Sequence, residues 1–282
     1  MYRTAFLILL YGKEAQDSIS IESLSKLDSE LENCKLLIWN NGPDYLKNEP
    51  VKLKFNDVET VETVENLGLA SIYNSFIDKV DAEQYVIFDD DTVVTAEYLR
   101  SLTTLSIDNA GVPIISHGNK RYEPVVNGRL FKGEPYTEVG ENDTITSIGS
   151  GLVLGRNVIN TVKSQYQHVF DERFMLYGVD DTFFRRINAI RLGQRFIILT
   201  ALSHSLSRLE DENSQTKAFR IKERAYAHAL ICKFYKPRRL SLTLFLKNCF
   251  KYSVKRLFNI ENDLHQKFFI IAYFKGKHYR AG

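Results

Sequence analysis

The sequence predicts an α/β protein whose core is a mixed, mainly parallel β-sheet flanked by helices. The first observation is that short apolar runs alternate with polar stretches of helical length over residues 1–110. The second is that runs such as TAFLILLY and KLLIWN are almost wholly apolar, as strands covered on both faces are. Strands that alternate with helices in this way form βαβ units, in which neighbouring strands run parallel.

The elements follow one another in a regular order. The predicted elements are strands at 4–11, 35–40 and 84–91 and helices at 18–33 and 68–80. Residues 111–150 contain many Gly, Pro and other turn residues, which predicts an antiparallel excursion with mobile loops. Residues 180–193 are predicted to form a helix that begins with acidic residues and ends at Gly193, and a strand follows over 194–199.

The character of the chain changes near residue 215, so we predict a sheet-forming domain over 1–215 and a basic amphipathic helical extension over 216–282. The formal net charge is +2, but the part from Lys217 to the end has 16 Lys and Arg against 3 Asp and Glu, or +13. This leaves 21 against 32, or −11, for residues 1–216. In the extension, Leu242, Leu246 and Phe250 recur at helical spacing beside lysines.

Composition limits the class of protein. With 282 residues, 44% of them hydrophobic and 26% charged, the chain fits a soluble globular protein rather than a disordered one. Three cysteines without metal-ligand spacing predict reduced thiols in the cytoplasm. The apolar run near the N-terminus is shorter than the roughly 20 residues of a membrane span and lacks a cleavage site, so it is predicted to be a strand.

Three consecutive carboxylates, Asp89, Asp90 and Asp91, directly follow the apolar run YVIF. Adjacent carboxylates repel one another and are costly to bring near an apolar interior. One interpretation is a solvated turn with an Asp helix cap. The other is a Mg²⁺ or Mn²⁺ site, because Asp89 and Asp91 share one face of an extended chain and supply hard oxygen ligands. A cation would offset the repulsion.

Three other places carry residue types that could serve chemistry. ENLGLASIYNSF places Asn66 and Gly68 where a helix begins, which suits either a polar ligand or an ordinary loop. Asp180 and Asp181 either stabilise a helix N-terminus through its dipole or provide a general base. His204 follows the last predicted strand and is either structural or completes the coordination sphere of a cation.

Six motifs succeed one another along residues 4–240: LLIWNNGPD, ENLGLASIYN, FDDDT, GSGLVLGRN, FDERFMLYGVDDTFFRRI and LSHSLS. Their order and spacing resemble those of the inverting glycosyltransferases of family 2, which have a Rossmann-like GT-A fold. Within that family the chain is most similar to bacterial rhamnosyltransferase-like and galactofuranosyltransferase-like enzymes that build surface polysaccharides such as capsule and O-antigen. The resemblance implies that residues 1–215 form a catalytic domain that binds a nucleotide sugar and an acceptor.

The resemblance also implies a role for each matching residue. Asp89 and Asp91 would form a DXD pair that, with His204, holds Mn²⁺ or Mg²⁺ against the diphosphate of a UDP- or dTDP-sugar. Asp181, or its neighbour Asp180, would be the catalytic base, and the spacing to Gly193 favours Asp181. The residues implied in donor binding are Asn40, Asp44, Asn66, Gly68, Asp89 and Asp90. Relatives usually carry Asp at the position of Asn40.

The implied reaction is the inverting transfer of a hexose to a hydroxyl of a glycan acceptor that is attached to a lipid. Lys247, Lys251 and Lys255 lie beside apolar stripes, which suits either a solvated, positively charged helical layer that covers the core or an interfacial helix. We favour the second and expect a cytoplasmic protein in peripheral contact with the anionic inner face of the membrane. No nucleic-acid partner is expected, because no binding motif is present and the acidic residues 1–216 would repel phosphates.

Two alternatives are a sugar nucleotidyltransferase and a non-catalytic glycan-binding or scaffold relative. The first would carry a basic, glycine-rich loop after the first strand, where LLYGKEAQDS has one Gly and one Lys. The second would have lost the acidic metal pair or the base, and both are present.

Overall fold

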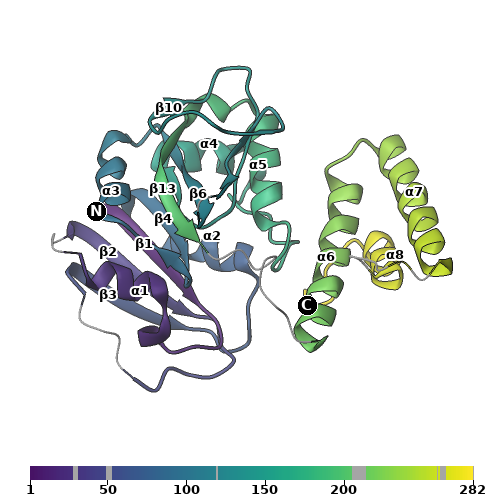
Figure 1. Ribbon diagram of the computed structural model, residues 1–282, viewed down its shortest axis with the longest axis horizontal. Coiled ribbons are helices and arrows are strands. Elements are labelled where there is room, and N and C mark those ends of the chain that lie inside the picture. The colour runs from purple at the N-terminus through teal and green to yellow at the C-terminus, as the bar shows by residue number, and fades with distance from the viewer. Residues whose placement is uncertain are drawn as a thin grey trace. The chain divides into compact units, whose positions relative to one another are not determined.

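A computed structural model describes residues 1–27, 31–48, 53–118, 120–204, 214–258, 260 and 265–281 (Figure 1). The chain divides into two compact units, which are described one at a time. The first unit consists of Met1–Leu67, Ile72–Val169 and Phe184–Leu209. The second unit consists of Gly68–Ser71, Phe170–Phe183 and Glu210–Gly282.

The first unit is built on one ten-stranded sheet with the order β10-β13-β6-β12-β4-β1-β2-β3, to which β5 and β7 add at β13 and β6. Strands β3, β2, β1 and β4 are mutually parallel, β6 is parallel to β13, and β12 runs antiparallel between β4 and β6. The strands are β1 (Tyr2–Leu10), β2 (Leu31–Asn40), β3 (Phe55–Glu62), β4 (Ala82–Asp89), β5 (Thr92–Val93), β6 (Ala110–His117), β7 (Lys120–Glu123), β10 (Thr137–Glu138), β12 (Leu152–Gly155) and β13 (Phe196–His204). This sheet confirms the predicted mixed, mainly parallel fold class.

The predicted antiparallel excursion is present. A small three-stranded antiparallel sheet joins β8 (Val125–Val126), β9 (Arg129–Leu130) and β11 (Ile145–Thr146). The turn between β8 and β9 contains Asn127 and Gly128, both with positive φ, as the turns of tight hairpins require.

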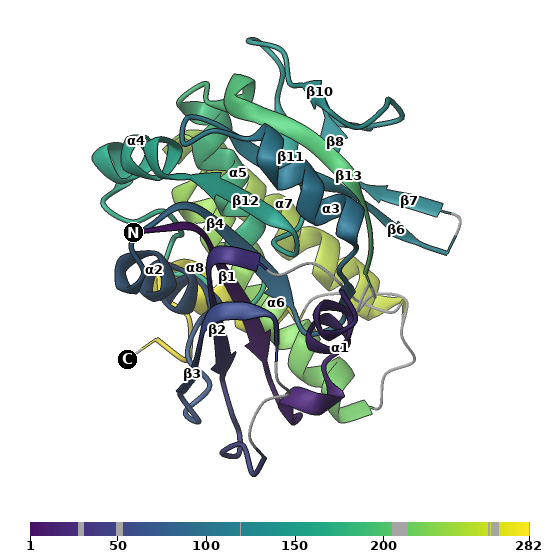
Figure 2. The same cartoon turned by 90° about the vertical axis from the view of Figure 1, so that its left-hand side faces the viewer.

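Helices flank the sheet because its strands are apolar on both faces (Figure 2). Phe6 and Ile8 of β1 lie in one core cluster with Ile21 of α1 and Tyr98 of α3, while the alternate residue Leu7 is also fully buried. A strand whose odd and even side chains are both buried needs cover on both sides. The helices are α1 (Ile19–Ser25), α2 (Leu69–Lys79), α3 (Ala96–Ser101), α4 (Arg156–Tyr166) and α5 (Val179–Ala189), with short 3₁₀ turns at Ala15–Asp17, Leu102–Thr104 and Gly193–Arg195.

Two predicted helices end earlier than their sequence pattern suggests. The helix predicted over 18–33 stops at Ser25, and the chain from Leu31 joins β2, because pairing with β1 and β3 outweighs the helical spacing of its apolar residues. The helix predicted over 180–193 stops at Ala189. Arg191 adopts a positive φ of 56°, which ends the helical path before Gly193 is reached.

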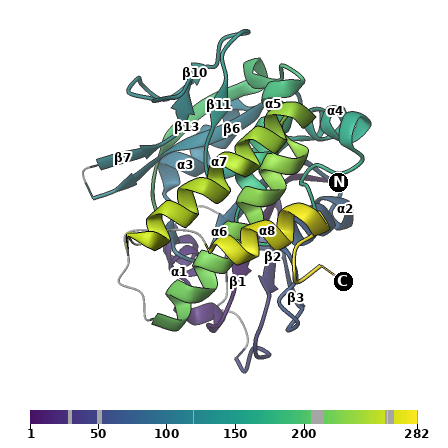
Figure 3. The same ribbon diagram turned by 90° about the vertical axis from the view of Figure 1, so that its right-hand side faces the viewer.

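Among the described residues, the C-terminal part of the second unit forms the helices α6 (Ser214–Phe234), α7 (Arg238–Leu257) and α8 (Gln266–Lys275) (Figure 3). Phe245 of α7 stacks on Phe269 and Tyr273 of α8, with ring centroids 5.7 and 4.3 Å apart. Ala225 and Ala229 of α6 complete this core as small residues that allow close helix packing. No helix among the described residues combines the length and apolar character that a membrane span needs.

Candidate metal and donor site

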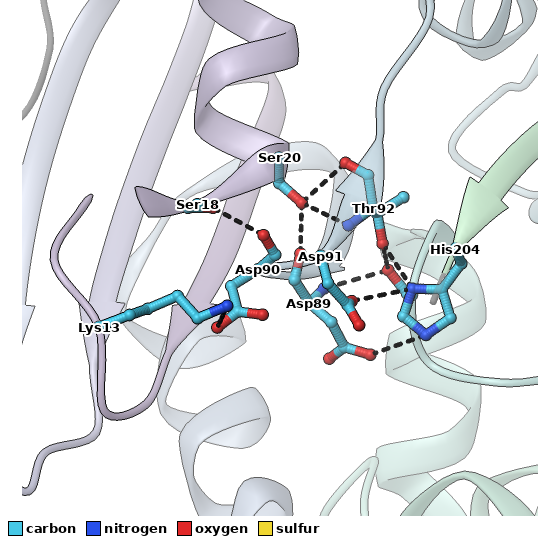
Figure 4. A network of polar contacts seen from close by, with 9 residues as sticks. Lys13, Ser18, Ser20, Asp89, Asp90, Asp91, Thr92 and His204 are labelled. Carbon is cyan, nitrogen blue, oxygen red and sulfur yellow. Dashed lines mark hydrogen bonds and ion pairs between the residues drawn. The ribbon is translucent and has the colours of Figure 1, made fainter. Parts of the chain in front are cut away.

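Asp89, Asp91 and His204 meet at one end of the sheet in the first unit (Figure 4). One ligand atom from each residue can be chosen so that all three lie within 4.8 Å of one another. Asp91 Oδ1 is 3.0 Å from His204 Nδ1, and Asp89 Oδ2 is 3.7 Å from His204 Nε2. The structure therefore brings together the three residues that the sequence predicted as metal ligands.

Strand pairing explains why Thr92 and His204, which are 112 positions apart in sequence, become neighbours. Strand β4 ends at Asp89, and the chain turns through Asp90 and Asp91 into the two-residue strand β5. β5 pairs antiparallel with the end of β13, so that Thr92 lies opposite His204. The turn after β4 therefore presents its carboxylates to the histidine that ends β13.

Hydroxyl groups of α1 hold the acidic turn in place. Ser20 Oγ contacts the carbonyl oxygens of Asp89 at 2.5 Å and Thr92 at 3.0 Å, and it accepts a hydrogen bond from the Thr92 N–H. Ser18, which caps the N-terminus of α1, donates its hydroxyl to the carbonyl oxygen of Asp90 at 2.9 Å. Backbone groups are thus satisfied by serines, and the carboxylates are left for other partners.

A chain of buried hydroxyls orients the imidazole. The Asp89 N–H donates to Ser150 Oγ at 3.1 Å, Ser150 Oγ lies 2.6 Å from Thr92 Oγ1, and Thr92 Oγ1 lies 2.9 Å from His204 Nδ1. The Asp91 carboxylate faces the same Nδ1, and two lone pairs at 3.0 Å would repel each other. We therefore assign the proton to Nδ1, which leaves the lone pair of Nε2 for a cation.

Burial and mutual repulsion shift the pKa values of the cluster. Burial, together with the neighbouring charges of Asp91 and Asp90, raises the pKa of Asp89 to about 6, although His204 counteracts part of the shift. Burial lowers the pKa of His204, but contact with Asp91 and the charge of Asp89 outweigh it, and the net pKa is raised. Asp89 therefore holds its proton more tightly than usual chiefly because it is removed from water, and His204 does so because carboxylates lie beside it.

The residues present fit a divalent cation. Two carboxylates and one imidazole are a donor set that Mn²⁺ accepts, whereas Mg²⁺ prefers oxygen ligands. Asp91 Oδ1 is buried and lies 3.0 Å from His204 Nδ1, and a carboxylate oxygen with one such contact keeps a lone pair for a cation. The Asp89 side chain is 38% exposed, so a ligand can reach the cluster from outside.

Asp90, the middle carboxylate, has a different partner. Its Oδ2 lies 3.0 Å from Lys13 Nζ, in the loop after β1. Burial raises the pKa of Asp90, and the Lys13 ammonium opposes that shift. Asp90 therefore points away from His204 and connects the acidic turn to the first loop of the sheet (Figure 4).

The segment after β2 forms a second polar turn. The Asn40 side chain is 1% exposed: its Nδ2 donates to Asp44 O and to Glu62 Oε1, and its Oδ1 accepts from the Gly42 N–H. Asn40 thus builds the turn, and Asp44 contributes its carbonyl oxygen to it. A Cβ at Gly42, where φ is 89°, would lie 2.5 Å from Val64 O, so glycine is required there.

Asn41 joins this turn to the segment that contains Asn66. Its Oδ1 accepts from the Leu67 N–H at 2.8 Å, and its Nδ2 donates to Leu67 O at 2.9 Å and to Asn66 Oδ1 at 3.4 Å. Asn66 adopts a positive φ of 56°, which asparagine tolerates. The two predicted donor segments of the first unit are therefore connected by one buried amide.

The remaining predicted residues lie in the second unit. Gly68 packs against Met175, and a Cβ there would lie 2.6 Å from the Met175 sulfur. Asp180 and Asp181 are half-buried in the first turn of α5, where the helix dipole favours carboxylates. Buried Asp171 anchors the chain before α5, since it accepts hydrogen bonds from Arg173 and from the Tyr235 hydroxyl.

Sequence reasoning did not identify several residues that build the site. The sequence did not identify Thr92, Ser150, Ser20, Lys13 or Asn41 as site residues. Thr92, Ser150 and Asn41 lie within motifs that were singled out, Lys13 lies in the loop after the first strand, and Ser20 lies in the helix predicted over 18–33. Only Thr92 carried a local signal, because it directly follows the acidic triplet. The others act through contacts between segments that are distant in sequence.

Comparison with models of protein families gives no match, and no curated protein matches the sequence. Solved structures do match. S. aureus TarS 1–349 has a TM-score of 0.52 at 15% identity, and the match covers 82% of this chain and 64% of that chain. TarS 1–349 in complex with UDP-GlcNAc has a TM-score of 0.50 at 13% identity, with 99% and 82% covered.

A third match is the mannosyltransferase PcManGT from Pyrobaculum calidifontis in complex with GDP-Man and Mn²⁺, with a TM-score of 0.51 at 14% identity and 89% and 72% covered. The chain spans 41% of the length of S. aureus TarS and 64% of TarS 1–349. At such identities the likeness concerns the fold. The chain has a central, mostly parallel sheet flanked by helices, which is the GT-A fold of glycosyltransferase structures.

Proposed function

We propose that this protein is a metal-dependent glycosyltransferase that uses a nucleotide-diphosphate sugar as donor. The observation that carries the proposal is the Asp89–Asp91–His204 cluster, which lies at the carboxyl end of β4 in a GT-A fold. Ligands of open α/β sheets bind beyond the carboxyl ends of the strands. The same edge carries the polar turn of Asn40, because Asn40 and Asp89 end two strands that both pair with β1.

The protein's own residues have distinct tasks in this proposal. Asp89, Asp91 and His204 Nε2 would hold the cation, with the Nδ1–H of His204 directed at Asp91 and Thr92. A bound Mn²⁺ supplies Lewis-acid stabilisation of the diphosphate leaving group. Asp181, or Asp180, accepts the proton of the acceptor hydroxyl, whose oxygen attacks the anomeric carbon from the face opposite the nucleoside diphosphate. The bond between the anomeric carbon and the diphosphate breaks, and the configuration is inverted. Asn40, Asp44, Asn66 and Gly68 shape the donor-binding segments.

The finer assignments rest on the motif resemblance. We propose membership of family 2, a UDP- or dTDP-hexose donor, and a lipid-linked glycan acceptor in bacterial surface polysaccharide synthesis. We also propose that residues 1–215 form the catalytic domain and that the protein works in the cytoplasm at the inner face of the membrane. The basic extension over 216–282 supports this location, because anionic lipids attract lysine and arginine.

The test is a panel of UDP-, dTDP- and GDP-sugars, each added with Mn²⁺, Mg²⁺ or EDTA. Slow donor hydrolysis and thermal stabilisation are measured. A donor at 100 times its dissociation constant adds about 2.7 kcal/mol to the free energy of unfolding. We expect one donor to stabilise the wild type only with metal, and the Asp91→Ala variant to lose this response.

Glu97→Gln is the matched control, because Glu97 is an exposed carboxylate on α3. It should respond to donor and metal as the wild type does. The proposal is wrong if no nucleotide sugar binds more tightly with either metal, or if Asp91→Ala retains the metal-dependent response.

A further inference from the structure

Helix α7 carries large apolar residues on two faces. Phe245 and Tyr252 are buried in the core of the second unit, where Phe245 stacks on Tyr273 and the ring of Tyr252 meets Phe269 edge to face. This inner face is therefore already covered by α6 and α8 (Figure 3). The apolar residues on the other face need a separate explanation.

The outer stripe, which we define as Leu242, Leu246, Phe250 and Leu257, is exposed to solvent. The exposed fractions of these residues are 54%, 59%, 73% and 78%. At 3.6 residues per turn, their positions fall within an arc of about 80° on the helix. Large apolar residues gathered on one exposed face mark an interaction surface far more often than scattered ones do.

The charge of α7 identifies the kind of partner. Its 20 residues contain six Lys and Arg and no Asp or Glu. At about 100° per residue, Arg238 and Lys247 lie about 40° and about 60° beyond the two edges of the outer stripe, and both are exposed. An apolar stripe with basic borders is the pattern of a helix that lies in the interface of an anionic bilayer.

A second copy of the chain fits this surface poorly. Two outer stripes in contact would bring two basic helices together without acidic partners, which costs free energy. A nucleic acid would satisfy the cations but leave the leucines in water. An anionic lipid surface satisfies both, because its headgroups pair with the cations and its acyl region receives the apolar side chains.

We propose that the outer stripe of α7 inserts into the interface of anionic membranes and that Arg238 and Lys247, at the two borders of the stripe, contact the lipid headgroups. This inference rests on the proposed membrane location and names the contacting surface, and it does not depend on the donor chemistry. Because each basic residue near an anionic surface contributes on the order of 1 kcal/mol, loss of one lysine should weaken vesicle binding about fivefold.

The test measures co-sedimentation of the full chain with two kinds of vesicle. One is phosphatidylcholine alone, and the other is phosphatidylcholine with about 30% of the anionic lipid phosphatidylglycerol. We expect the wild type to bind the anionic vesicles and to be released by salt. The double variant Leu246→Gln, Phe250→Gln should bind at least tenfold more weakly, and Arg238→Gln, Lys247→Gln should do the same at low salt.

Two controls remove comparable groups elsewhere: Ile107→Gln, whose side chain is 37% exposed, and Lys132→Gln, which is exposed. Both should bind as the wild type does. The proposal is overturned if the wild type does not bind anionic vesicles, or if both double variants bind them as tightly as the wild type does. It is also overturned if the leucine–phenylalanine variant turns a dimer into a monomer without any change in vesicle binding, because the stripe would then be a self-association surface.

Discussion

Thr92 Oγ1 lies 2.9 Å from His204 Nδ1, and both side chains are buried. Replacement of Thr92 by Val removes this hydroxyl with little change of shape and leaves the imidazole with less to fix its orientation. Loss of an orienting partner of this kind typically costs 10- to 100-fold in metal affinity. We expect Thr92→Val to weaken Mn²⁺ binding by about that factor in titration calorimetry.

Thr92→Ser keeps the hydroxyl and should bind Mn²⁺ as the wild type does. The ¹⁵N chemical shifts of His204 in the metal-free protein provide a readout that does not depend on activity. They should report a proton on Nδ1 in both the wild type and Thr92→Val, because Asp91 still faces that nitrogen, so a loss of affinity would come from the orientation of the ring and not from its tautomer. Equal Mn²⁺ affinities of wild type and Thr92→Val would refute the role of this hydroxyl.

Asp181→Asn should suppress sugar transfer while donor binding persists. A general base contributes about 10²- to 10⁴-fold to the rate, and an amide cannot accept the proton. The measurement compares kcat with the thermal shift that donor and Mn²⁺ produce. Asp180→Asn is the internal comparison, and if both variants kept wild-type turnover, neither carboxylate would be the base.

Mn²⁺ affinity should fall as the pH is lowered. The pKa of Asp89 is raised to about 6 and that of His204 is also raised, and the cation requires both groups without their extra protons. Below these pKa values, each displaced proton weakens the apparent affinity about tenfold per pH unit. Titration calorimetry at pH 8 and pH 5.5 measures the change, and an affinity independent of pH would exclude these groups as ligands.

Without metal, the acidic cluster should cost the protein stability at neutral pH. The pKa of Asp89 is higher in the folded chain than the ordinary 3.8, so the folded state binds more protons between pH 4 and 6. The free energy of unfolding therefore falls as the pH rises through this window, and the full cost remains above it. In EDTA at pH 7.5 we expect Asp89→Asn to melt at a higher temperature than the wild type.

Glu97→Gln serves again as the control and should not raise the melting temperature. Addition of Mn²⁺ should reverse the order, since only the wild type binds the cation fully. If Asp89→Asn in EDTA melted at or below the temperature of the wild type, the charge of Asp89 would not destabilise the metal-free folded protein.

Contacts to the buried carboxylate of Glu223 should stabilise the second unit. The Glu223 side chain is fully buried, with His278 Nε2 3.4 Å and Arg280 3.8 Å from its oxygens. Burial alone would raise the pKa of Glu223, but contacts with His278 and Tyr279 lower it overall. His278→Ala should therefore reduce the free energy of unfolding by about 1–3 kcal/mol, as measured by urea denaturation, because Glu223 loses one of its partners.

In a Glu223→Gln background, His278→Ala should lower the free energy of unfolding clearly less. The side chain at position 223 is then uncharged, so the loss of one partner costs less. The difference between the two costs is the coupling free energy of the pair. Equal costs in both backgrounds would show that His278 acts through packing on Tyr226 alone.

The sequence by itself determined the strands around the site, because an apolar run covered on both faces reveals a buried strand. It also singled out Asp89 and Asp91, although these residues meet through the turn at Asp90 and Asp91 and not through an extended chain. Both the apolar run and the acidic triplet are local features of the chain. The mainly parallel fold followed from the alternation of such runs with helices, whereas helix ends at Ser25 and Ala189 were missed because strand pairing and the backbone at Arg191 decided them.

Only the tertiary structure decided which distant groups meet these carboxylates. The antiparallel pairing of β5 with β13 places His204 beside Thr92. Helix α1 brings Ser20 into hydrogen-bond contact with the same turn. Asn40 looked like a ligand residue in the sequence, yet its amide is used within its own turn. Strand register and hydrogen-bond partners depend on contacts across the whole sheet, and the energy of such contacts is not encoded in any short segment of the chain.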